Sequence, residues 1–97
     1  MLLSKIQLDL KEALKAREDI RLSTLRFLLA EIRNKESQKQ KPLTEEEVVT
    51  AIRQQVKMRR ESIAAFQKAG RLELVDKEEQ ELKVLSNYLP PDILCVV

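Results

Sequence analysis

The sequence predicts an all-α protein, an antiparallel four-helix bundle, on three observations. Apolar residues recur at intervals of three and four along most of the 97 residues, which is the repeat of one helix face. No stretch alternates apolar and polar residues for long, and no glycine-containing hairpin turn indicates a β-strand. Aromatic residues make up only 3% of the chain, so Leu, Ile, Val and Ala fill a modest core, as interlocking helices allow.

Two helices are expected before Pro42. Ser4 is the expected N-cap of the first helix, which should run to about residue 16 with a narrow apolar seam of Ile6, Leu10, Ala13 and Leu14. The second helix should follow the charged residues 17–19 and end before Pro42, because proline cannot continue a helix. Its inward face is expected to consist of Leu22, Leu25, Leu28, Leu29 and Ile32.

The next helix begins at a capping box, in which Thr44 is followed three residues later by Glu47. It should run to Gly70, which can adopt the left-handed conformation that stops a helix. Its apolar face is formed by Val49, Ile52, Val56, Ile63 and Phe66. The fourth helix is expected over residues 72–89, ended by the proline pair that follows, with inward residues Leu74, Val75, Leu82, Leu85 and Leu89.

Two charged residues interrupt the apolar faces of these last two helices. Arg59 and Glu78 each stand where an apolar residue is due. A very short turn at Gly70 should make the two helices antiparallel, which brings Arg59 level with residues 78–82. We therefore expect Arg59 to be mostly buried and paired with Glu78 or Glu81. Such a pair sets the register of the hairpin, and a catalytic or ligand-binding role is the alternative.

Charge is sorted between the same two helices. Residues 53–71 hold six basic residues against one acidic residue, whereas residues 72–89 hold five acidic against two basic. We call one stripe the basic ridge, and its members are Arg53, Lys57, Arg60, Lys68 and Arg71. Arg26 and Arg33 on the second helix could extend it. Such a surface suits the phosphate backbone of a nucleic acid, which the protein would recognise by its shape more than by its bases. The alternative is a solvated face with ion pairs inside the helix.

Composition excludes many kinds of site. The chain has no His, one Cys and one Gly, which excludes His-dependent triads, Cys/His metal sites and Gly-rich phosphate loops. We expect no cofactor, no metal and no membrane span. The single thiol and the lack of an apolar leader predict a cytoplasmic protein. A small enzyme built from carboxylates with Lys or Arg is the least favoured class of function.

Three segments resemble the GatB/YqeY family, in order along the chain: RLSTLRFLLAEIRNKE, QVKMRRESIAAFQKAGR and EEQELKVLSNYLP. The resemblance implies a four-helix bundle, here residues 1–89, followed by a second helical bundle. In place of that second bundle the chain reads PPDILCVV, so residues 90–97 are expected to be a linker and the stub of a missing or shortened bundle. We expect the apolar residues 93–97 to be poorly ordered or to cover a neighbouring molecule, and Cys95 to be an incidental thiol.

The resemblance also implies a function. The family includes the tail of the B subunit of the glutamine-dependent aspartyl/glutamyl-tRNA amidotransferase, a carbon–nitrogen ligase with glutamine as amido-N-donor. The chain is therefore expected to be a helical accessory module that associates with tRNA or another RNA and has no catalytic residues of its own. The alternative is a protein–protein interaction adaptor with an amidotransferase-like partner.

Overall fold

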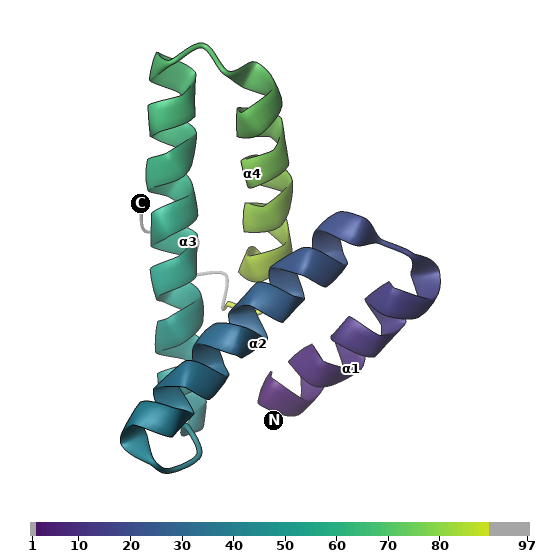
Figure 1. Cartoon of the computed structure of the whole chain (residues 1–97), viewed down its shortest axis with the longest axis vertical. Coiled ribbons are helices and arrows are strands. Elements are labelled where there is room, and N and C mark those ends of the chain that lie inside the picture. The colour runs from purple at the N-terminus through teal and green to yellow at the C-terminus, as the bar shows by residue number, and fades with distance from the viewer. Residues whose placement is uncertain (1, 90–97) are drawn as a thin grey trace.

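Four helices make up the fold in a computed structural model that describes residues 2–89 (Figure 1). They are α1 (Leu2–Ala16), α2 (Asp19–Lys39), α3 (Glu45–Lys68) and α4 (Leu72–Ser86). The predicted all-α bundle is confirmed, and no strand occurs in the described part of the chain. The expectations for residues 90–97, including the incidental thiol at Cys95, lie outside the described residues.

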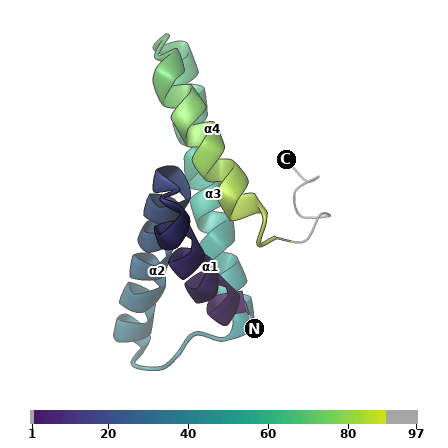
Figure 2. The same ribbon diagram turned by 90° about the vertical axis from the view of Figure 1, so that its right-hand side faces the viewer.

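The helices pair as two hairpins, α1 with α2 and α3 with α4. Helix α2 crosses the α3–α4 hairpin, and the end of that hairpin near Gly70 projects beyond α2 in both views (Figures 1 and 2). The core lies at the crossing and is filled by aliphatic side chains, the largest fully buried ones being Ile6, Leu25, Leu28, Ile32, Ile52, Leu85 and Val48. This crossing leaves part of the α3–α4 hairpin uncovered beside α2.

The ends of α3 agree with the local sequence signals. The Thr44 hydroxyl accepts a hydrogen bond from the Glu47 backbone N–H at 3.2 Å, and Glu47 accepts one from the Thr44 N–H at 2.9 Å. At the other end Gly70 has φ of 73°, and the Arg71 N–H donates to the Phe66 carbonyl oxygen at 2.9 Å. The capping box and the left-handed glycine therefore define this helix as predicted.

Two predicted helix ends are wrong. Helix α1 begins at Leu2, so Ser4 lies inside it, and the Leu2 N–H is satisfied at 3.0 Å by the carboxylate of Glu45 on α3. Helix α4 ends at Ser86 rather than at Leu89, although Leu89 is buried as expected. Both differences arise from contacts with other helices, which cannot be predicted from the local sequence pattern.

The apolar seams also differ in detail. Leu14, expected in the seam of α1, is mostly exposed because α1 packs through a narrower face that holds Ile6 and Ala13. On α3, Val48 is fully buried and Val49 only partly, since the start of α3 is covered by both α1 and α2.

A polar network holds the end of α4 against the α1–α2 hairpin. The Tyr88 hydroxyl donates to Asp9 at 2.6 Å, and the Arg21 guanidinium lies 3.5 Å from the same carboxylate. Burial raises the pKa of Tyr88 well above its usual range, and the hydrogen bond to Asp9 adds to this effect. Lys5 lies over the ring of Tyr88, 5.7 Å from its centroid. Tyr88 is therefore a tertiary anchor, which explains why the chain leaves the helix before it.

The capping box gives a testable pH dependence. The ammonium group of Lys39 donates to Glu47, and with the Thr44 N–H it lowers the pKa of this carboxyl from 4.5 to about 2. The folded-state pKa is lowered, so this contribution to stability is complete above pH 4.5 and is lost as the pH falls toward 2. We expect Lys39→Met to raise the pKa of Glu47 toward 4.5, measured by NMR titration of its carboxyl carbon. Lys41→Met, which removes a nearby exposed charge, should leave that pKa unchanged, and an equal effect of both variants would contradict the assignment.

Candidate functional site

The basic ridge lies on the outer face of α3. Arg53, Lys57 and Lys68 are exposed and Arg60 is partly exposed, and their spacing places them on the side of the helix away from the core. Arg71 follows α3 and occupies the N-cap position of α4, at the projecting end of the hairpin. From Arg53 to Lys68 the ridge extends roughly 22 Å along the helix, at 1.5 Å per residue.

Arg26 and Arg33 are also exposed, but on α2. At 100° per residue they lie nearly opposite Lys35 and about 100–120° around the helix from Phe27, and both of these residues line a hollow shared with α3. The structure therefore places Arg26 and Arg33 on a separate basic edge and does not bring them onto the ridge.

The cations of the ridge have no acidic partner among residues 2–89. No ion pair or side-chain hydrogen bond in this part of the chain involves Arg26, Arg33, Arg53, Lys57, Arg60, Lys68 or Arg71. Other basic side chains are paired, such as Arg21 with Glu18 at 3.0 Å. The ridge thus presents uncompensated positive charge to solvent.

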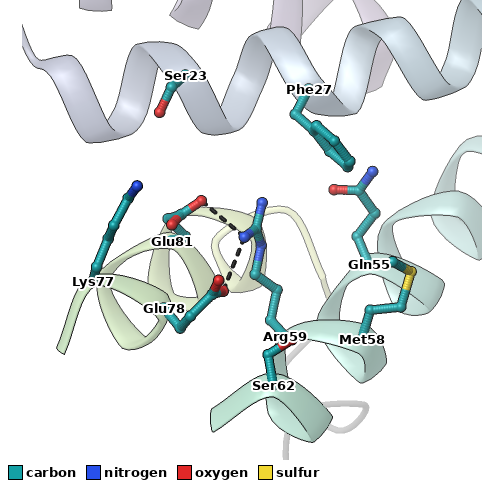
Figure 3. A pocket seen from close by; sticks show the side chains of 9 residues that line it. All are labelled: Ser23, Phe27, Gln55, Met58, Arg59, Ser62, Lys77, Glu78 and Glu81. Carbon is teal, nitrogen blue, oxygen red and sulfur yellow. Dashed lines mark hydrogen bonds and ion pairs between the residues drawn. The ribbon is translucent and has the colours of Figure 1, made fainter. Parts of the chain in front are cut away.

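On the opposite face of α3, Arg59 is held by two carboxylates of α4. Its Nη1 atom lies 2.9 Å from Oε2 of Glu78 and 2.8 Å from Oε2 of Glu81 (Figure 3). The side chains are 16%, 18% and 9% exposed, respectively. The expected partner Glu78 is present, and Glu81 makes the pair a triad with one negative charge in excess.

The triad forms one wall of a hollow of about 350 Å³ between α2, α3 and α4 (Figure 3). Phe27, from α2, has its ring over the Arg59 guanidinium, with 5.7 Å between the guanidinium carbon and the ring centroid. The other lining residues come from all three helices and are Ser23, Gln55, Met58, Ser62 and Lys77. Phe27 and Met58 are about half-exposed, so the hollow has an apolar rim.

Gln55 is the residue that sequence reasoning missed. It is only 5% exposed, and neither its side-chain nitrogen nor its side-chain oxygen has a hydrogen-bond partner within residues 2–89. In the sequence it looks like any polar residue of a helix, and only the crossing of α2 over α3 buries it. The one available signal was its helix position, which lies within about 60° of the predicted apolar residues Ile52 and Phe66 on the same face.

The described residues contain no group of three or more His, Cys, Asp or Glu placed to hold a metal ion. None of the helices within residues 2–89 has the length and apolar character needed to cross a membrane.

Comparison with known proteins gives a consistent result. Residues 3–94 match the YqeY-like protein family. The chain is 38% identical over 87 residues to the Altered inheritance of mitochondria protein 41, mitochondrial, of Kluyveromyces lactis, covering 89% of this chain and 47% of that protein. The namesake protein of Eremothecium gossypii is 40% identical over 88 residues, 90% of this chain and 48% of that protein. An uncharacterized protein of Schizosaccharomyces pombe is 36% identical over 88 residues, 88% of this chain and 69% of that protein.

These relatives correct one prediction. Several are named as mitochondrial proteins, which contradicts the cytoplasmic location expected from the sequence. That expectation relied on a single thiol and the lack of an apolar leader, and neither feature distinguishes the cytosol from another reducing compartment. The chain spans about half the length of most of the curated relatives it matches.

Proposed function

Because this chain belongs to the YqeY-like protein family, we propose that it is a helical module that binds RNA through the phosphates facing its basic ridge. The carrying observation is the line of exposed cations on α3 that have no acidic partner among residues 2–89. Lys and Arg in such a line suit phosphate oxygens, and they identify no base. We assign no catalytic role to any residue of this module.

The distribution of charge supports this proposal. The ridge and the segment around it carry six basic residues against one acidic, and the acidic residues of α4 lie on the other member of the hairpin. The ridge also continues to Arg71 at the end of the hairpin that projects beyond α2, where a large polyanion meets no steric obstacle from α1 or α2 (Figure 1). Electrostatic attraction of this kind steers association and depends strongly on salt.

Transfer RNA is the RNA that we propose, from the resemblance of the chain to the tail of an amidotransferase subunit. The names of the relatives support a mitochondrial location for the module. A role as an accessory of an amidotransferase-like enzyme follows from the same resemblance, and the reaction itself would belong to that enzyme.

The proposal is tested by titrating total tRNA with the full chain at about 50 and 200 mM salt. If all five cations of the ridge contact phosphates, the slope of log K against log salt should be roughly −3.5 to −4.5, which lowers the affinity roughly 100- to 500-fold between the two conditions. Circular dichroism should show that the chain is folded in both. A folded chain that shows no association at the lower salt concentration, or a slope near zero, would refute the RNA function.

A further inference from the structure

The hollow beside Arg59 has the properties of a second binding site. It lies where α2 leaves part of the α3–α4 hairpin uncovered, and Figure 3 shows side chains from all three helices directed into it. At 100° per residue its α3 members, Gln55, Met58 and Ser62, lie about half a turn from Arg53, Lys57 and Arg60 of the basic ridge. An RNA held on the ridge therefore lies on the far side of α3, and the hollow has to take a different ligand.

The charge of the hollow argues against a phosphate. Arg59 is shared between Glu78 and Glu81, which leaves one negative charge, and Lys77 at the edge brings the total of the four groups to zero. A phosphate placed here gains no net attraction and meets two carboxylates. A neutral ligand pays no such cost, which favours a polypeptide over a nucleic acid.

Gln55 indicates which polar group this ligand carries. Its buried amide has one donor side and one acceptor side, both without a partner in the described residues. A buried amide without partners is destabilising, so a ligand that satisfies both sides at once gains affinity. An extended peptide offers this match, because one residue of a strand presents its N–H and its C=O on the same side.

The rim supplies the apolar contacts. Figure 3 shows the ring of Phe27, from α2, beside the amide of Gln55, from α3. Met58, also on α3, lines the same hollow. Phe27 is 48% exposed and Met58 is 58% exposed, so both have room to move. A ligand that displaces the ring of Phe27 reaches the amide, and its own apolar side chain then packs between the ring and the flexible thioether of Met58.

We propose that this hollow binds a short extended segment of a partner protein, which pairs the backbone N–H and C=O of one residue with the amide of Gln55 and inserts a neighbouring apolar side chain between Phe27 and Met58. The ridge and the hollow are then independent sites on opposite faces of α3.

The test uses a displayed library of random seven-residue peptides, selected on the full chain and measured individually by calorimetry. Selected peptides should bind at least tenfold more weakly to Gln55→Met and to Phe27→Ala, and equally well to the control Gln67→Met, which replaces an exposed glutamine of the same helix. The Gln55 side-chain amide should shift in the NMR spectrum when the peptide binds. Failure of the library to yield a binder, or equal affinity for Gln55→Met and wild type, would overturn the proposal.

Two further measurements on Gln55→Met, its melting temperature and its affinity for tRNA, distinguish a peptide site from a structural role of Gln55 and from the RNA site on the ridge. Gln55→Met should melt at a higher temperature than wild type because it removes an unpaired amide, and a lower melting temperature would show that the amide already has partners and refute the proposal. The affinity for tRNA should be the same for Gln55→Met and wild type. A loss of tRNA affinity in this variant would show that the hollow serves RNA and would also overturn the peptide assignment.

Discussion

Replacing Arg59 with leucine is expected to lower the free energy of unfolding by about 3 kcal/mol, because it leaves two nearly buried carboxylates without their cation. Glu78 and Glu81 are 18% and 9% exposed and lie at 2.9 and 2.8 Å from the same guanidinium nitrogen. The change also removes the contact between Arg59 and the ring of Phe27. For a domain of this size the melting temperature should fall by roughly 12–24 °C, as followed by circular dichroism.

Compensating changes distinguish an unpaired charge from lost packing. The double variant Arg59→Leu with Glu78→Leu removes only one of the two carboxylates, because Glu81, the least exposed of the three side chains, remains. We therefore expect the double variant to recover only part of the loss, and the triple variant with Glu81→Leu to recover most of it. Arg53→Leu, an exposed position on the same helix, is the matched control and should be nearly neutral. If Arg59→Leu has the same melting temperature as the control Arg53→Leu, the triad does not stabilise the fold.

The second large effect is expected on RNA affinity. Changing Arg53, Lys57 and Arg60 together to glutamine removes three of the five cations of the ridge, and should reduce the salt slope by about 2 to 3 if each contacts a phosphate. At about 50 mM salt the affinity for tRNA should fall by one to two orders of magnitude, on the order of 1 kcal/mol per lost contact. Helicity should persist, since glutamine is nearly as good a helix former as lysine or arginine.

A variant with the same loss of charge elsewhere separates local contacts from net charge. Lys11, Lys15 and Lys83 are exposed and lie on α1 and α4, away from the ridge, so their joint replacement by glutamine is the control. We expect this control to weaken tRNA binding far less than the ridge variant does. Equal losses for the two variants would mean that RNA responds only to net charge, and the ridge would no longer be a site.

The parts of the fold that the sequence predicted correctly are those with local causes. Thr44 and Glu47 satisfy each other within one helical turn, and Gly70 ends α3 through its own backbone conformation, so neither needs a distant residue. The predictions of Ser4 as an N-cap and of Leu89 as the end of α4 were wrong because these helix ends depend on distant residues. The start of α1 is satisfied by Glu45 on α3, and the end of α4 is held by the bond from Tyr88 to Asp9.

The same distinction applies to the candidate sites. The basic ridge can be predicted from the spacing of its cations along one helix. The pairing of Arg59 with Glu78 can be predicted by counting residues outward from the short turn at Gly70. The hollow depends on the angle at which α2 crosses α3, because this crossing buries Gln55 and leaves Phe27 half-exposed above it. The crossing angle cannot be derived from any repeat in the sequence, so the burial of the Gln55 amide could not be predicted from the sequence.

The division into two hairpins has a consequence for the order of folding. Each hairpin joins helices that are neighbours in sequence, so its contacts close only short loops, and such local structures form quickly. The contacts of α2 with α3 and α4 span longer stretches of chain and should form afterwards, in a docking step. The hollow exists only once this step is complete, because its walls belong to both hairpins. A chain emerging during synthesis would therefore carry the cations of α3 in place before it could engage anything through Gln55.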